Sequence, residues 1–261
     1  MSEFSSRTRA LVGDGGVEAL ASARVAVFGV GGVGSNAAEA LARCGVGGFM
    51  LVDFDVVAES NLNRQIMATR ETIGLRKVDA MRDRILSINP FADVRAVFGF
   101  YGEGADSRFD LSGVGYIIDA MDAVASKVAL ALRAERDGIP IVSCMGAGGR
   151  LDPTRFKVAD IYDTKGCPLA RAVRCECRRR GVRALKAVYS DEPPAGAQVA
   201  GGSGGERAPG LAEGAEGIAE GAERAYAKRA PLGAISFVAA AAGLVLAAEA
   251  ARGIIGKKDS L

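Results

Sequence analysis

The stretch VAVFGVGGVGSNAAEALARCG, residues 25–45, restricts the fold of this chain more than any other feature. Apolar residues lead into a run of closely spaced glycines, and a segment rich in alanine follows. This order predicts a buried strand, a tight turn and a helix, and the apolar run Phe49–Asp53 supplies the next strand. Bare glycine backbone lets a phosphate approach, and the helix N-terminus points N–H groups at it. The sequence therefore contains a βαβ unit of the kind that binds nucleotides.

The rest of the chain alternates between short apolar runs and helical patterns, which predicts an α/β fold with a doubly wound, mostly parallel, Rossmann-like sheet. Gly138 and Gly181 are placed to end helices, and Pro168 to begin one. Besides the helix after the glycine turn, we expect helices at 77–87, 124–137 and 167–181, and strands at 25–29, 49–53, 94–100, 116–121, 139–144, 156–161 and 184–190.

The length of 261 residues, with 49% apolar residues, is enough for one large domain over residues 1–261. Its low-complexity tract AEGAEGIAEGAE has no apolar face, which favours a flexible loop there. The expected parts are an N-terminal segment 1–23, a nucleotide-binding core 24–145, a substrate-side extension 146–190, the loop 191–229 and a C-terminal helix 230–256.

The uncharged stretch Pro231–Ala248 reaches the lower length limit for a membrane span. Small residues dominate it, and Glu249 and Arg252 follow directly. This composition favours a helix in the core or in a dimer interface over a membrane contact.

The chain has no histidine, which excludes Ser-His-Asp and Cys-His nucleophile pairs and every His-ligated metal site. Its net charge of +2 is small, so an anionic partner would need a local cluster of basic residues. Five unevenly spaced cysteines, and a first segment without a long apolar run, favour a protein of the reducing cytoplasm.

Gly29, Gly31 and Gly34 match the dinucleotide-binding fingerprint. Asp53 ends the next strand, where a carboxylate can accept hydrogen bonds from ribose hydroxyls. These residues serve NAD and ATP equally well. The alternative is a glycine turn that only eases the packing of helix against strand.

Arg64, Gln65 and Lys77 follow Asp53 and favour ATP over NAD. Negative charge grows on the phosphates as pyrophosphate leaves, and cations aimed there stabilise that state, whereas hydride transfer does not need them. The alternative for Arg64 and Lys77 is that both are solvated surface charges.

Asp119 and Asp122 follow an apolar strand, at the edge where open α/β sheets bind ligands. Two carboxylates there suit Mg²⁺, which takes few protein oxygens beside phosphates. Asp119 could instead cap the next helix, so Asp122 is the stronger candidate ligand.

Several motifs, taken in order, resemble the ubiquitin-activating-enzyme-like (ThiF/MoeB-type) adenylating superfamily. Within it, the segments FSSRT, NRQI, INPFADV, CPLARAVR and ISFV closely resemble the tRNA threonylcarbamoyladenosine dehydratases, over nearly the whole chain apart from 191–229. The superfamily motifs are GVGGVG at 29–34, DFD at 53–55, NLNRQ at 61–65, Lys77 and DAMD at 119–122.

The resemblance implies a cytoplasmic homodimer that uses ATP to adenylate the carboxylate of threonylcarbamoyladenosine in tRNA and closes it into a ring, with release of AMP and pyrophosphate. It implies Arg64, Lys77 and Asp122 as the catalytic residues. Asp122 would also hold Mg²⁺ through ATP, and Arg7 would reach the phosphates of a partner subunit. A monovalent cation and a sulfur-transfer protein are further candidates. The implied nucleotide-binding residues are Arg7, Gly29, Gly31, Gly32, Gly34, Asp53, Asp55, Asn61, Asn63, Arg64, Gln65, Lys77, Asp119 and Asp122.

Three other functions compete with this one: an NAD-linked oxidoreductase, a nucleotide-binding scaffold without catalysis, and an adenylyltransferase that activates the C-terminus of a sulfur-carrier protein. Relatives that activate sulfur carriers have paired Cys-x-x-Cys zinc ligands. The spacing of Cys167, Cys175 and Cys177 differs, so we expect no zinc. A thiol relay through Cys144 or Cys167 is less favoured than packing, because no neighbouring base is evident.

The segment ARAVRCECRRRGVRALK, residues 170–186, is the local basic cluster. We expect it to contact RNA phosphates, with a solvated basic face as the alternative. Arg171, Arg174 and Arg178 share one predicted helical face, and Arg179, Arg180, Arg183 and Lys186 extend it.

Overall fold

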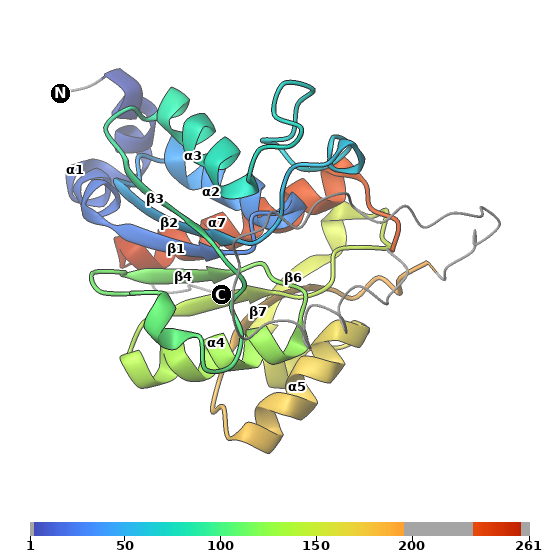
Figure 1. Cartoon of the computed structure of the whole chain (residues 1–261). Helices are drawn as coiled ribbons and strands as arrows, with labels where there is room; N and C mark the ends of the chain where they lie inside the picture. Colours follow the sequence, from blue (N-terminus) through green and yellow to red (C-terminus); the bar gives the residue numbers. More distant parts are fainter. Residues whose placement is uncertain (1–2, 196–231, 257–261) are drawn as a thin grey trace.

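A seven-stranded sheet forms the centre of the protein (Figure 1). The computed structural model describes residues 3–195 and 232–256. The strands are β1 Arg24–Phe28, β2 Gly48–Asp53, β3 Asp93–Phe98, β4 Tyr116–Asp119, β5 Ile141–Cys144, β6 Phe156–Asp160 and β7 Lys186–Ser190. Their order is β3-β2-β1-β4-β5-β7-β6, and all neighbours are parallel except β6 and β7. The predicted doubly wound, mostly parallel sheet is confirmed.

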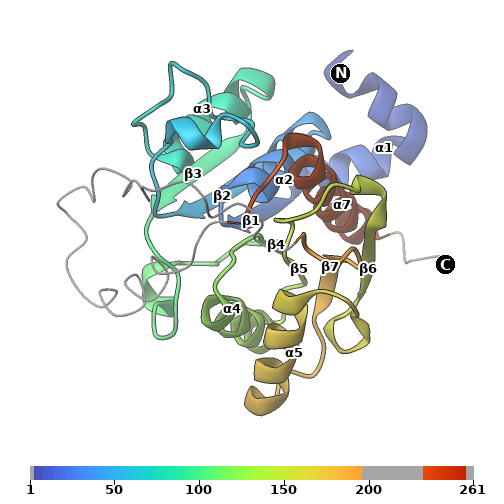
Figure 2. The ribbon, with the colours of Figure 1, turned by 90° about the vertical axis from the view of Figure 1, so that its right-hand side faces the viewer.

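Helices cover both faces of this sheet (Figure 2). They are α1 Ser6–Ser22, α2 Gly32–Arg43, α3 Lys77–Ile88, α4 Val124–Asp137, α5 Pro168–Arg180 and α7 Ser236–Ile255. α1, α2, α3 and α7 lie on one face, and α4 and α5 on the other. Because the sheet is covered on both sides, β2 is buried along its whole length and is apolar at successive positions rather than at alternate ones.

The predicted elements are present with slightly different ends. α4 spans the predicted 124–137, and Gly138 ends it in the left-handed conformation, with a φ of 67°. Gly181 ends α5 in the same way, with a φ of 78°. The predicted strand 116–121 stops at Asp119, because the Asp119 carboxylate accepts the N–H of Met121 and turns the chain out of the sheet.

Helix α1 lies in residues 1–23, for which the sequence analysis expects only a segment. It contains three glycines, which are poor helix formers, and Gly13, with a φ of 75°, kinks it. Its second half packs on the end of α7, where a Cβ on Gly16 would lie 3.5 Å from the side chain of Ile255. Tertiary contact therefore stabilises a helix that the local sequence does not favour. Of the predicted loop 191–229, residues 191–195 form irregular chain, and the rest lies outside the described residues.

The predicted C-terminal helix is α7, and one of its faces packs against α2 and the sheet. Val238, Ala242 and Leu246 are buried there, so the predicted burial is confirmed for this face. Gly243 allows the close contact, since a Cβ on it would lie 2.5 Å from the carbonyl oxygen of Val33. Among the described helices, α7 is the one long and apolar enough to cross a membrane.

We expect Gly243→Ala to lower the free energy of unfolding by about 1–3 kcal/mol, because the added methyl group overlaps the backbone of α2. Gly15→Ala is the matched control, since a Cβ there meets nothing within 4 Å. It should leave stability unchanged or raise it slightly. Urea unfolding measures both, and equal stability of Gly243→Ala and wild type would contradict the observed packing of α7 on α2.

Candidate functional site

The carboxyl ends of β1 and β4 form the edge at which an open α/β sheet binds its ligand. The chain leaves β1 for α2 on one face of the sheet, and leaves β4 for α4 on the other. Phe28, at the end of β1, pairs with Asp119, at the end of β4. The predicted segments 29–34, 53–55 and 119–122 therefore meet at one place, called here the carboxyl edge.

The glycine turn, residues 29–34, contains glycines that packing requires and one that faces open space. Gly29 has a φ of +86°, and a Cβ on it would lie 2.7 Å from the carbonyl oxygen of Ala120. A Cβ on Gly34 would lie 1.9 Å from the carbonyl oxygen of Gly29. Nothing lies within 4 Å of a Cβ built on Gly31, the N-cap of α2. Packing accounts for Gly29 and Gly34, whereas the space at Gly31 leaves room for an anion beside the first amides of α2.

Asp53 ties the glycine turn to the end of β2. Its carboxylate accepts the N–H of Val30, at an N–O distance of 2.6 Å, and the N–H of Asp55, at 2.9 Å. Burial raises the pKa of Asp53 above its ordinary value, although the positive charge of Lys77 opposes the shift. The carboxylate is therefore held beside the turn by two backbone N–H groups.

Lys77 and Arg64 approach the glycine turn from two different segments. Lys77 is only 6% exposed, and its ammonium pairs with the Asp55 carboxylate at 2.7 Å. Arg64 is half-buried and donates to the side-chain oxygen of Asn63 at 2.8 Å. Its Cγ would lie 3.3 Å from a Cβ on Gly32. Lys77 is therefore not the solvated surface charge of the alternative interpretation.

The segment 61–65 connects the glycine turn with α7. The Asn61 side chain is buried and accepts the N–H of Ala58 at 3.1 Å. Asn63 donates to the carbonyl of Ala234, just before α7, at 2.9 Å. Gln65 is 5% exposed, and its Oε1 has no hydrogen-bond partner in the described part of the chain. A buried oxygen without a partner is a group that a ligand hydroxyl or amine can satisfy.

The two candidate carboxylates after β4 lie in different surroundings. Asp119 is fully buried and accepts from the Ser143 hydroxyl at 2.6 Å and from the Lys127 ammonium at 3.1 Å. It does not cap α4, whose N-cap is Ala123. Asp122 is exposed directly before α4. The structure therefore places Asp122, and not Asp119, where a ligand can reach a carboxylate.

Lys127 is a functional candidate that the sequence analysis missed. It lies in α4, is fully buried, and also donates to the carbonyl of Cys144 at 2.6 Å. One sequence signal could have indicated it: in a helix, position 127 shares a face with Leu130, Ala131 and Ala134, which are all buried. A single lysine within an apolar stripe is a candidate for a buried, paired charge.

Arg7 lies away from the carboxyl edge of its own chain. It is exposed in the first turn of α1, close to Phe4. The Phe4 ring lies 3.9 Å from a Cβ on Gly45, just beyond the C-terminal end of α2. The 12 residues of α2 span about 18 Å, and the glycine turn is at the other end. A role of Arg7 in phosphate binding therefore requires a second subunit.

Two of the five cysteines, Cys144 and Cys177, are poorly suited to react as thiolates. Burial raises the pKa of Cys144 to about 12 and that of Cys177 to about 11, which keeps both protonated. Cys167 is buried, and Cys175 is exposed on α5. In residues 3–195 and 232–256, no group of three or more Cys, Asp or Glu side chains is placed to hold a metal ion.

The basic cluster 170–186 is largely paired within the protein. Arg174 donates to the hydroxyl of Thr164 at 2.7 Å and to its carbonyl at 2.9 Å. Arg178 lies over the ring of Tyr162, 5.3 Å from its centre. Arg171 is exposed and forms no ion pair with another described residue. The paired members are Arg179 with Glu176, Arg180 with Glu103, Arg183 with Glu135 and Lys186 with Glu249.

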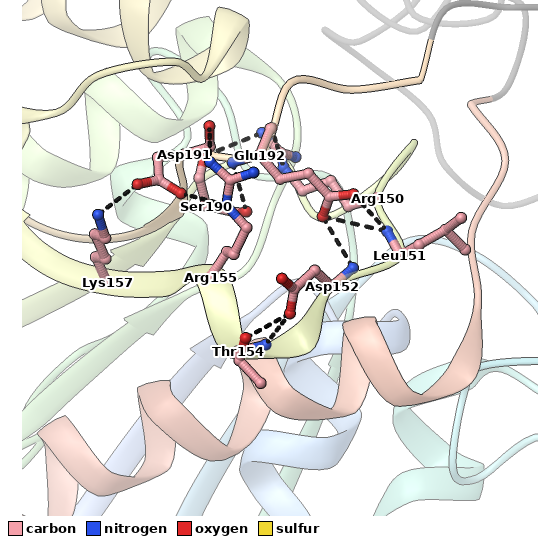
Figure 3. Close-up of polar contacts among 9 residues, drawn as sticks. All are labelled: Arg150, Leu151, Asp152, Thr154, Arg155, Lys157, Ser190, Asp191 and Glu192. Carbon is pink, nitrogen blue, oxygen red and sulfur yellow. Dashed lines mark hydrogen bonds and ion pairs between the residues drawn. The ribbon is translucent and has the colours of Figure 1, made fainter.

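A network of polar contacts fixes the chain where it leaves β7 (Figure 3). Arg150 is buried and donates to the backbone carbonyl of Glu192 at 3.2 Å. The Glu192 carboxylate accepts the N–H of Leu151 at 3.0 Å, and Asp191 pairs with Arg155 at 2.8 Å. Residues 150–155 of the predicted substrate-side extension are thus joined to residues 191–192, directly after β7, by side chains of both segments.

Known proteins are similar to this chain in sequence. The chain matches the sequence profile of the ThiF family over residues 5–261. It is 45% identical over 190 residues to the tRNA threonylcarbamoyladenosine dehydratase of Bacillus subtilis, which covers 72% of this chain and 75% of that protein. It is 34% identical over 173 residues to the molybdopterin-synthase adenylyltransferase of Salmonella typhimurium, 66% of each chain.

A solved structure extends the similarity to the fold. The crystal structure of the E. coli tRNA N6-threonylcarbamoyladenosine dehydratase, TcdA, in complex with ATP matches with a TM-score of 0.80 and 32% identity. The match covers 98% of this chain and 95% of that chain.

We expect alanine at Gly34 and at Gly31 to act differently. Gly34→Ala should destabilise the fold by about 1–3 kcal/mol, because its Cβ would overlap the turn itself. Gly31→Ala should leave stability close to wild type but weaken nucleotide binding about tenfold or more, because the methyl group enters the space beside the α2 amides. Urea unfolding and the Kd of a fluorescent ATP analogue measure these effects. Unchanged nucleotide affinity in Gly31→Ala would show that the phosphates lie elsewhere.

Proposed function

The chain belongs to the ThiF family, and on this premise we propose that it is an ATP-dependent tRNA threonylcarbamoyladenosine dehydratase. It adenylates the carboxylate of threonylcarbamoyladenosine in tRNA and closes that substituent into a ring. One observation carries the proposal: a glycine turn with open space at Gly31 lies at the carboxyl edge, with Asp53, Arg64 and Lys77 around it, in a chain similar to such dehydratases.

The chemistry follows from the poor reactivity of a carboxylate toward nucleophiles. One carboxylate oxygen attacks the α-phosphorus of ATP, and pyrophosphate leaves with the electrons of the broken P–O bond. A nitrogen of the same substituent then attacks the acyl carbon, loses its proton, and displaces AMP, which keeps the carboxylate oxygen. The nucleoside thereby loses one water. Proximity within one substituent lowers the second barrier by several kcal/mol, so neither histidine nor a thiol is needed.

Each residue around the glycine turn has a distinct role in this reaction. The amides of the first turn of α2, beside Gly31, bind phosphate oxygens. The Asp53 carboxylate accepts hydrogen bonds from the ribose. Arg64 and Lys77 stabilise the negative charge that grows on the phosphates as pyrophosphate leaves. An ammonium has three N–H donors, so Lys77 can keep its contact with Asp55 and still bind phosphate.

Asp122 is the residue that would hold Mg²⁺. It is exposed at the carboxyl edge, whereas Asp119 is fully buried against Lys127. Magnesium takes one or two protein carboxylates beside phosphate oxygens and water, so a single carboxylate fits. When bound, the ion neutralises charge on the triphosphate. A monovalent cation stays a prediction.

The competing functions are less well supported. The comparisons favour the dehydratase over the activation of a sulfur-carrier protein, because the identity to the dehydratase is the higher and the fold match is to a dehydratase. The solved E. coli relative is in complex with ATP, which supports ATP over NAD here. A sulfur-transfer protein stays a predicted partner.

We also propose a homodimer whose interface includes the outer face of α7. Phe237 and Leu244 are 47% and 55% exposed, and with Ala248 they recur at helical spacing on one face. Exposed apolar stripes of this kind mark interaction surfaces. In such a dimer, Arg7 would serve the phosphates of the second subunit. The five free cysteines support the further proposal of a reducing, cytoplasmic location.

The tRNA contact is proposed at the start of α5. Arg171 and Arg174 line a hollow of about 550 Å³ there, together with Thr164, Cys167 and Cys175. None of the described residues that line this hollow is acidic. Arg174 is held in place by hydrogen bonds to Thr164, whereas Arg171 is exposed, so we assign the contact with an RNA phosphate to Arg171.

The proposed activity is tested with pure protein, ATP, Mg²⁺ and tRNA carrying threonylcarbamoyladenosine. Nucleoside mass spectrometry should show the loss of one water, with one AMP released per ring. We expect Asp122→Ala to slow the reaction about 100-fold or more, because an ion on the triphosphate stabilises the transition state. Asp83→Ala, an exposed acid on α3, is the control. ATP binding without AMP release would instead support the scaffold, whereas a fully active Asp122→Ala would contradict the role proposed for Asp122.

Arg171→Glu should weaken tRNA binding. It should also reduce the slope of log Kd against log salt concentration by the amount that corresponds to about one phosphate contact. The matched control is Arg179→Glu, an equal change of charge on the same helix at a residue already paired with Glu176. Filter binding over a range of salt concentrations measures both. Equal affinities and slopes in the two variants would place the RNA contact elsewhere.

A further inference from the structure

The buried ammonium of Lys127 has no part in the function proposed so far. The side chain is fully buried in α4, and its partner Asp119 is equally buried. Removing two charges from water is costly, and well-packed apolar side chains of similar size are often as stable in such places. The pair therefore has little value for stability alone, which raises the question of what else it does.

Lys127 joins the ends of two neighbouring strands. Its Nζ lies 3.1 Å from the Asp119 carboxylate at the end of β4, and 3.2 Å and 2.6 Å from the Ser143 hydroxyl and the Cys144 carbonyl at the end of β5. The Ser143 hydroxyl also donates to Asp119 at 2.6 Å. One ammonium thus fixes β4, β5 and α4 relative to one another directly beneath the carboxyl edge.

The residues that follow Asp119, 120–122, lie beside the glycine turn of the proposed nucleotide site. The other Asp119 oxygen accepts the N–H of Met121 at 3.1 Å, which sets the turn that carries Asp122. Between them, Ala120 donates its N–H to the carbonyl of Phe28 at 2.8 Å. The Ala120 carbonyl lies 2.7 Å from the place of a Cβ on Gly29. A shift of Asp119 would therefore move Asp122 and the first residue of the glycine turn together.

We propose that Lys127 is a positioning residue for the adenylation reaction: by holding Asp119 between Ser143 and Met121, it sets where Asp122 stands relative to the glycine turn. This inference rests on the role proposed for Asp122. A displacement of about 1 Å at a reacting centre can cost up to about 100-fold in rate, so a network that fixes this turn has kinetic value beyond its stability.

The double variant Lys127→Met/Asp119→Asn separates positioning from stability. Both charges are removed, the sizes are nearly kept, and asparagine can still accept the N–H of Met121. We expect Lys127→Met alone to be strongly destabilised, because it leaves a buried carboxylate unpaired, and the double variant to recover most of that loss. The kcat of the double variant should nevertheless fall about tenfold or more, while its KM for tRNA stays unchanged. The double variant should also bind ATP more weakly than wild type in the presence of Mg²⁺.

Arg133→Met is the control, because Arg133 is a second buried cation of α4. It donates to the carbonyl of Phe109, and none of its contacts is with the turn 119–123. It should lower stability but leave kcat and Mg²⁺-dependent ATP binding unchanged. Wild-type kcat and ATP affinity in a stable double variant would overturn the proposal.

Two further readouts keep the test decisive if the double variant folds poorly. Ser143→Ala removes one contact without a charge and should lower kcat in the same direction. Amide hydrogen exchange at 120–123 should be faster in Ser143→Ala than in wild type, and equal exchange with equal kcat would contradict the proposal. If wild type binds ATP but does not convert the tRNA, the proposed function fails, while ATP binding and hydrogen exchange still decide the role of Lys127.

Discussion

The contact between the glycine turn and the end of β4 is the constraint on which the rest of the site depends. Gly29 and Gly34 leave no room for a side chain between β1, the start of α2 and the backbone of Ala120. The Asp53 carboxylate then fastens the same turn to β2 through the N–H of Val30. The direction of the first α2 amides is thereby fixed by three strands, before any nucleotide binds.

Around this rigid turn the charges are arranged in an order that suits acyl-adenylate formation. Lys77 is held by Asp55, and Arg64 lies against Gly32, so both cations are held in place near the position that we propose for the phosphates. The two carboxylates after β4 differ in their surroundings. Asp119 is buried and pairs with Lys127, whereas Asp122 is exposed at the carboxyl edge. A chain without histidine can run this chemistry because leaving-group activation replaces a protein nucleophile.

The sequence predicted those parts of the site whose structure is decided by neighbouring residues. The glycine turn, Asp53 and the ends of α4 and α5 follow from local periodicity and turn chemistry. The role of Lys127 could not be predicted locally, because its contacts are with Asp119 and Ser143, which lie in two other elements. The sequence predicts that the cluster 170–186 contacts RNA phosphates, but it does not reveal that Arg180 and Arg183 pair with acids far away in the sequence. Helix α1 was not predicted, because its glycines disfavour a helix and the stabilising contact is with α7, at the other end of the sequence.

The fate of a carboxylate oxygen tests the central claim, adenylation at the carboxyl edge, most directly. tRNA in which both carboxylate oxygens of threonylcarbamoyladenosine are ¹⁸O is converted with unlabelled ATP in unlabelled water, and the AMP is analysed by mass spectrometry. Adenylation followed by ring closure predicts one ¹⁸O in the phosphate of AMP for each ring formed. Ring formation with AMP free of ¹⁸O would contradict an acyl-adenylate, whatever the affinity of the site for ATP.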